Sequence, residues 1–170
     1  MKKMFLAAAL AIAALACLQA IPAQGKEKED PRLRAAVLKA VDEGNLTVSW
    51  SYARSQNGST ADCSGYIFTL KDGKAKTTLP FFGIGDVNSA YGSEGDRSII
   101  FEDYPVQNYS VDKSKLEKRS KLFIHFRAKS GVSTCDVDIT IFTNGSVSMT
   151  VHPGSRSTMY YEGNLTELYY

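Results

Sequence analysis

Cysteine, histidine and surplus charge are all scarce in this sequence, and each shortage excludes a class of site. The chain has 170 residues, of which 3 are Cys and 2 are His. Neither Cys63 nor Cys135 has a second Cys or a His at ligand spacing, so we expect no metal site. Lys and Arg number 20 against 18 Asp and Glu. Nucleic-acid binding needs a basic surface that displaces counterions from phosphate, so we predict no nucleic-acid partner.

Long apolar runs are also missing, except for one near the N-terminus, and that run predicts export. Two lysines precede an apolar stretch over residues 5–16, which at about twelve residues is shorter than the roughly twenty of a membrane span. Residues 23–25 (AQG) fit the small-x-small pattern of a signal-peptidase site. The sequence therefore predicts a signal peptide over residues 1–25 and a single domain over 26–170.

Cys17 provides an alternative processing route. Residues 14–17 (ALAC) stand where a bacterial lipobox would, but the large and small residues before the cysteine are in swapped order. Lipidation would remove residues 1–16 and anchor the protein through acyl chains on Cys17. Either route removes both N-terminal lysines and no acid, so the formal charge falls from 20 − 18 = +2 to 18 − 18 = 0. Both routes predict the periplasm or cell envelope, and the second predicts anchoring to the outer membrane.

The mature chain begins with one predicted helix over residues 31–43. Asp30 is a good N-cap residue and Pro31 suits the first helical position. Gly44 provides the C-terminal stop. Between them, apolar residues recur at the spacing of a single helical face, namely Leu33, Ala36, Val37, Ala40 and Val41.

From Leu46 onward the apolar period changes to two, which is typical of strands. Val48, Trp50 and Tyr52 are expected to face inward. Asp-Gly and Asn-Gly pairs at 72–73 and 144–145 are hairpin signals, and Gly163 is expected to end the last strand. We predict a mainly β (α+β) fold with eight or nine strands in a curled antiparallel meander. It forms a half-closed barrel, with the helix on its open face or mouth.

Cys63 and Cys135 have two interpretations. In an oxidising compartment they could form a disulfide that closes a long loop. Alternatively they are two small buried side chains, since Cys135 alternates in phase with Val137 and Ile139.

The most suggestive segment for ligand binding is residues 80–96, a glycine-rich stretch that carries Phe81, Phe82 and Tyr91. Long loops with aromatic residues are often binding loops, so these three are the predicted ligand-binding residues. Phe81 and Phe82 could instead plug one end of the sheet, and we favour this interpretation. The stretch has neither a dinucleotide-binding nor a phosphate-binding glycine pattern, and we predict no cofactor.

Two polar groups have ordinary explanations. Residues 113–121 contain five basic side chains, which could contact lipid headgroups or acidic polysaccharide; a solvated hairpin loop is the commoner case. His125, Asp136 and Asp138 are expected on a solvated strand face. No nucleophile elbow or catalytic triad is visible, so no catalytic residue is predicted.

Several segments together resemble a known family. They are residues 65–70 (GYIFTL), 79–83 (LPFFG), 101–104 (FEDY), 144–145 (NG) and 156–163. The sequence is similar to domain-of-unknown-function family 4251, exported proteins of Gram-negative anaerobes. Members more often have Tyr where Phe81 stands. The resemblance implies an envelope location and supplies no activity.

These observations favour a non-catalytic envelope protein that binds an unidentified ligand or protein partner. A structural or accessory subunit of an envelope assembly is the alternative, and a hydrolase ranks third. Contact with the membrane is expected only through an N-terminal lipid anchor.

The processing prediction is tested by the intact mass of the protein recovered from its native envelope. We expect a chain that begins at Lys26, because the residues before Cys17 fit a lipobox poorly. A mass that begins at Cys17 and includes acyl chains would contradict this expectation and establish a lipoprotein.

Overall fold

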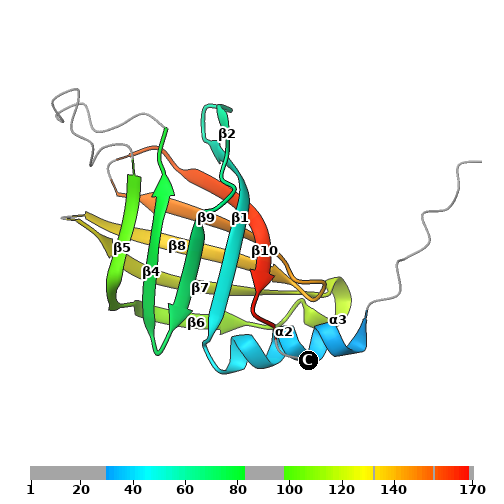
Figure 1. Cartoon of the computed structure of the whole chain (residues 1–170). Helices are drawn as coiled ribbons and strands as arrows, with labels where there is room; N and C mark the ends of the chain where they lie inside the picture. The colour runs from blue at the N-terminus through cyan, green and yellow to red at the C-terminus, as the bar shows by residue number, and fades with distance from the viewer. Residues whose placement is uncertain (1–29, 83–97, 132, 155, 169–170) are drawn as a thin grey trace, which may run out of the picture.

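The computed structural model describes residues 30–82, 98–131, 133–154 and 156–168. Figure 1 shows a curled sheet with one long helix at its lower end. Within the described residues no helix has the length and apolar character needed to cross a membrane. The elements in chain order are α2 (Pro31–Asp42), β1 (Leu46–Ser55), β2 (Thr60–Asp62), β3 (Ile67–Lys71), β4 (Lys74–Pro80), β5 (Ser98–Pro105), β6 (Gln107–Asp112), α3 (Leu116–Arg119), β7 (Lys121–Ser130), β8 (Ser133–Phe142), β9 (Ser146–Pro153) and β10 (Met159–Thr166).

The strands form one antiparallel sheet in the order β5-β4-β3-β1-β10-β9-β8-β7-β6, with β2 added on β1. Strands adjacent in the chain are mostly adjacent in the sheet, which confirms the predicted meander. The first long strand pairs with the last, so the gap in the barrel lies mid-chain, between β5 and β6. The predicted fold class is therefore confirmed, with one strand more than expected.

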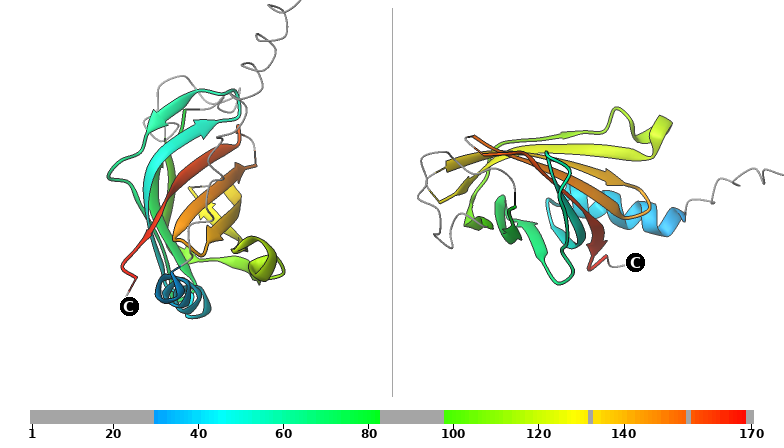
Figure 2. Two further views of the ribbon diagram at one scale, coloured as in Figure 1. Left: turned by 90° about the vertical axis from the view of Figure 1, so that its right-hand side faces the viewer. Right: turned by 90° about the horizontal axis from the view of Figure 1, so that it is seen from above.

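The gap is nearly closed at one end. There β5 comes close to β7, and the backbone N–H of Ile100 donates to the Oγ of Ser130 at 3.1 Å. A side chain thus completes the barrel where a ladder of backbone hydrogen bonds is absent. Figure 2 shows the resulting two layers, with α2 between them at one mouth of the barrel.

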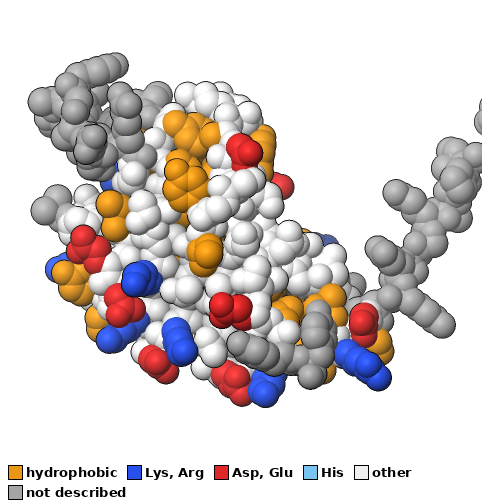
Figure 3. All heavy atoms as spheres, in the orientation of Figure 1, with side chains coloured by type: hydrophobic (Ala, Val, Ile, Leu, Met, Phe, Trp, Pro, Cys, Tyr) orange, Lys and Arg blue, Asp and Glu red, His pale blue; other side chains and the backbone are white. Residues whose placement is uncertain are grey.

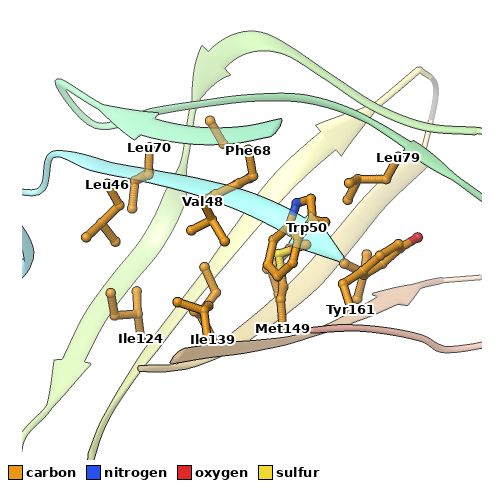
Figure 4. Close-up of a cluster of buried hydrophobic side chains, with 14 of the residues drawn as sticks. Leu46, Val48, Trp50, Phe68, Leu70, Leu79, Ile124, Ile139, Met149 and Tyr161 are labelled. Carbon is orange, nitrogen blue, oxygen red and sulfur yellow. The ribbon is translucent and has the colours of Figure 1, made fainter. Parts of the chain in front are cut away.

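Aromatic rings cross the interior and connect the two layers. Trp50 on β1 lies 6.4 Å from Phe68 on β3, and Phe68 stacks on Phe126 of β7 at 6.3 Å between ring centroids. On its other side Trp50 lies 5.9 Å from Tyr161 of β10. Figure 4 shows Trp50, Phe68 and Tyr161 among aliphatic side chains from both layers. Such pairs contribute about 1 kcal/mol each beyond their burial.

Two sequence predictions are wrong at one place, where β1 and β10 meet. The register shifts between Trp50 and Tyr52, and this bulge adds Ser51 to β1 without a partner. After Trp50 the next side chain of β1 that points inward is therefore that of Ala53. Tyr52 is exposed instead of buried. Gly163, expected to end the last strand, lies inside β10 opposite Trp50.

Gly163 is needed because the two backbones approach too closely for a side chain. A methyl group on Gly163 would lie 2.2 Å from the carbonyl oxygen of Ser49 and 2.9 Å from the Cα of Trp50. The bulge also orients the Ser51 carbonyl toward the backbone N–H of Cys63, which donates to it at 3.1 Å. The short strand β2, absent from the sequence prediction, lies beside β1 as a result.

The helix α2 forms as predicted. The Asp30 side chain accepts a hydrogen bond from the backbone N–H of Arg32 at 2.9 Å, and Pro31 occupies the first turn. The buried face consists of Ala36, Val37 and Val41. This face covers one mouth of the barrel, as predicted.

Gly163→Ala tests the close approach of β1 and β10. We expect it to lower the free energy of unfolding by about 2–3 kcal/mol, because backbone atoms must move to admit the methyl group. Urea unfolding measures the loss. Gly154→Ala is the matched control, since its new Cβ would meet only the Thr134 carbonyl oxygen at 3.8 Å. If both variants lost the same free energy of unfolding, the close approach of β1 and β10 would not be what requires glycine at position 163.

Candidate functional site

Two of the three predicted ligand-binding residues, Phe81 and Phe82, lie in the described part of the chain, and both contact the hydrophobic core. Phe81 is 5% exposed and belongs to the hydrophobic core, while Phe82 packs against that core. The guanidinium of Arg156 lies 4.7 Å from the centroid of the Phe81 ring, a cation–π contact. Tyr91 lies outside the described residues. The placement of Phe81 agrees with a plug at the end of the sheet, and a ligand-binding role for this segment stays a prediction.

Cys63 and Cys135 are both buried and both free thiols in the structure. Burial raises the pKa of Cys135 to about 11 and also raises the pKa of Cys63. Both lie near Tyr161, whose hydroxyl donates to the carbonyl oxygen of Pro80 at 2.9 Å. Burial raises the pKa of Tyr161, and the two cysteines add to that effect. Cys17, the predicted lipidation residue, lies outside the described residues.

The two histidines meet at one carboxylate on the outer face of β7, β8 and β9. The Nδ1 of His125 lies 2.9 Å from Asp138, and the Nε2 of His152 lies 3.5 Å from the other oxygen of the same carboxylate. On its far side, His152 Nδ1 lies 3.1 Å from the hydroxyl of Thr158. The three side chains are about half exposed on an open face. This arrangement lies on a solvent-exposed surface and not in an enclosed cleft. Catalytic groups usually need such a cleft, because it excludes water from around them.

Metal binding finds no support in the described part of the chain. No group of three or more His, Cys, Asp or Glu side chains there is arranged to hold a metal ion. Asp136 lies next to the two histidines, and its Oδ1 accepts a hydrogen bond from the Nε of Arg127 at 2.7 Å.

A groove on the outside of the barrel is the better candidate. It consists of two adjoining hollows of about 590 and 730 Å³. Ile67, Thr69 and Asp103 line both hollows. The groove therefore crosses the outward faces of β3, β4 and β5 and continues to the helix α2.

One wall of the groove comes from α2 and the other from the C-terminal strand. The helix contributes a single face, and β10 and the residues after it contribute the last four described positions. These lining residues are Ala36, Lys39, Ala40 and Glu43 from α2, and Leu165, Thr166, Glu167 and Leu168 from the C-terminal end. Both walls thus combine apolar and charged side chains.

The floor of the groove also has both charges. Lys71 and Lys76 lie beside Glu102 and Asp103. Figure 3 shows basic and acidic side chains interspersed over the lower part of this face. A groove with this lining suits a ligand that has both charges and apolar groups.

Two of the residues that line both hollows depart from the usual pattern of a strand, one in its exposure and the other in its backbone conformation. Ile67 points outward and is 53% exposed, the most exposed of the large hydrophobic side chains described. Asp103 has φ +60° and is the extra residue of a bulge in β5, where the register with β4 shifts between Ala75 and Lys76. A residue other than glycine rarely adopts this backbone conformation, and such strain is common at binding sites.

The sequence matches the family described as Domain of unknown function (DUF4251) over residues 28–165. The chain belongs to this family. The match confirms the resemblance found in the sequence and extends it to α2 and β1.

The fold recurs in a solved family member. A crystal structure of a DUF4251 family protein from Bacteroides eggerthii DSM 20697, at 1.95 Å resolution, aligns with a TM-score of 0.58 and 16% sequence identity. The alignment covers 78% of this chain and 86% of that chain. At this identity the likeness establishes the fold alone. No curated protein matches the chain.

The groove was not predicted from the sequence, although the sequence contains two signals of it. Three consecutive apolar residues, Tyr66 to Phe68, cannot all face inward in a strand of period two, so one had to be exposed. Asp103 is a poor strand former directly after the predicted strand over residues 97–102, and in the structure the strand continues past it through a bulge. Neither signal shows that the two residues share a groove.

The burial of the two thiols generates a prediction for the chain carrying Cys17→Ser. We expect Cys63 and Cys135 to react with a thiol reagent at about pH 8 at least about 100-fold more slowly in the native protein than in denaturant. With a pKa of about 11, Cys135 has about a hundredth of the thiolate fraction of an ordinary cysteine. Two reactive thiols in denaturant would favour the interpretation as two buried side chains. If no thiol reacts until a reductant is added, the two cysteines form the disulfide of the other interpretation.

Proposed function

We propose that the chain is an exported, non-catalytic protein of the cell envelope that binds a ligand or partner through the groove beside α2. The observation that carries this proposal is that the exposed Ile67 and the strained Asp103 each line both hollows. The predicted signal peptide supports the envelope location.

The lining of the groove favours an extended peptide segment as the ligand. Ile67 and Leu168 offer apolar contacts, while lysines and carboxylates lie within the same hollow. A peptide backbone with mixed side chains satisfies both kinds of contact, because apolar groups bury against the floor and charges pair along the walls. A nucleotide would instead need a concentration of positive charge.

The absence of catalysis is proposed from the surroundings of the titratable groups. His125, Asp138 and His152 lie on an open sheet face, where water competes for every proton and charge. Catalytic groups usually lie in clefts that exclude water and shift their pKa values. We therefore interpret the contacts among these three side chains as ordinary interactions on a solvated surface and not as a catalytic site.

A structural or accessory role is the second candidate, and it is favoured by the free edge of β6. Five of its six residues are exposed, and among the strands that the structure describes β6 pairs with β7 alone. An edge of this kind can accept a strand from another protein. A complex recovered from the envelope that disappears when β6 is altered, and not when the groove is altered, would favour this candidate.

The groove proposal is tested by panning a random-peptide library on the folded protein. We expect the recovered peptides to bind Ile67→Lys at least about tenfold more weakly than the unmodified chain, because a charge replaces the apolar centre of the groove. Bound peptides should also shift the backbone amide NMR signals of Thr69 and Asp103.

Tyr52→Lys is the matched control for this experiment. It places the same charge on an outward side chain of the same sheet, and Tyr52 is 38% exposed and lies outside the groove. Peptides that bind both variants equally well would place the binding surface elsewhere and overturn the proposal.

A further inference from the structure

The hairpin between β6 and β7 carries a group of unpaired cations. Lys115, Lys118 and Arg119 are all exposed on or beside α3. Within the described part of the chain no ion pair engages any of the three. We refer to these three residues as the basic cluster.

Residues 112–121 contain two acidic and five basic side chains, so the acids offset only part of the positive charge. Glu117 forms an ion pair with Arg34 of α2 at 2.8 Å. The Asp112 carboxylate accepts hydrogen bonds from the backbone N–H of Ser114 at 2.7 Å and from its hydroxyl at 3.1 Å. These hydrogen bonds lower the pKa of Asp112, and the charge of Lys115 adds to that effect. The remaining cation at the start of the hairpin, Lys113, pairs with Asp42 of α2. The charge left over at this end of the molecule is positive.

The same contacts fix where the N-terminal segment joins the folded domain. The Arg34–Glu117 ion pair holds the first turn of α2 against α3, and Figure 1 shows the start of α2 beside α3. Asp30, the described residue to which residues 1–29 are joined, therefore lies at the end of α2 that contacts α3. Residues 1–29 are the segment in which the sequence predicts the export signal and, in the alternative route, acylation of Cys17.

We propose that the basic cluster binds the anionic headgroups of a membrane surface and so orients the domain on it. Charge complementarity identifies the partner, and the point where residues 1–29 attach places the cluster on the side that a membrane-bound N-terminus would face. Basic side chains near an anionic leaflet each raise partitioning by about fivefold at low salt. A basic patch is also the usual second attachment that makes a lipid anchor stable.

The experiment is a vesicle sedimentation assay with residues 26–170, the predicted mature domain, which lacks both Cys17 and the apolar run of residues 5–16. The vesicles are phosphatidylcholine with a quarter of phosphatidylglycerol, and the reference vesicles are phosphatidylcholine alone. We expect binding to the anionic vesicles only, lost at about 0.5 M salt because screening shortens the reach of the charges. Adding Lys115→Gln and Lys118→Gln should weaken binding by about 25-fold.

The matched control is Lys74→Gln with Lys129→Gln, which removes the same charge from two exposed lysines outside the hairpin. Lys129 lies eight residues along β7 from its start at Lys121, about 26 Å away in a strand and beyond the screening length. We expect this control to bind anionic vesicles within about twofold of the parent chain. Unchanged melting temperatures would exclude misfolding as the cause of any loss.

Three outcomes would overturn the proposal. One is equal binding to anionic and neutral vesicles, and another is an equal loss in the two double variants. The third is binding to a soluble acidic polysaccharide, such as polygalacturonate, without binding to vesicles. Failure here would leave the groove proposal intact, because the peptide assay uses neither lipid nor the basic cluster.

Discussion

The architecture depends on the close approach of the first long strand to the last. Where Trp50 lies opposite Gly163, the backbones of β1 and β10 come so near that no side chain fits at position 163. The bulge beside this contact keeps the Trp50 ring in the interior and turns the Ser51 carbonyl toward Cys63. From Trp50 the aromatic contacts continue through Phe68 to Phe126 and so connect the two layers.

Local patterns in the sequence were sufficient to predict most of the fold. The Asp30–Pro31 start of α2, the two hairpin turns and the alternating strands all depend on neighbouring residues, and all formed as expected. The errors at Tyr52 and Gly163 arose because a bulge and a close backbone approach depend on a partner strand far away in the sequence. Periodicity within one segment contains no information about that partner.

The candidate site was less predictable because its parts come from distant segments. Ile67, Asp103 and Leu168 each look like ordinary surface positions until the sheet curls and α2 covers its mouth. Of the aromatic residues predicted to bind a ligand, Phe81 packs into the core, as the alternative interpretation of a plug expected. The groove is lined by β3, the C-terminal end of β10 and one face of α2, whereas the basic cluster lies on or beside α3. Figure 2 shows α3 on the other side of α2 from β3 and β10. A membrane bound to the basic cluster would therefore leave the groove free for a partner.

The pairing of the chain's two ends also sets the order in which the domain can fold. Thr47 pairs with Thr166, and the hydroxyl of Thr166 donates to the carbonyl oxygen of Thr47 across 119 residues of sequence. Contacts this distant in sequence are slow to form. A chain that emerges from a ribosome or a translocation pore N-terminus first must therefore hold β1 with one edge unpaired until nearly all of its length has followed. Until then Trp50 has no Tyr161 beside it, and the nascent protein is a candidate for chaperone protection.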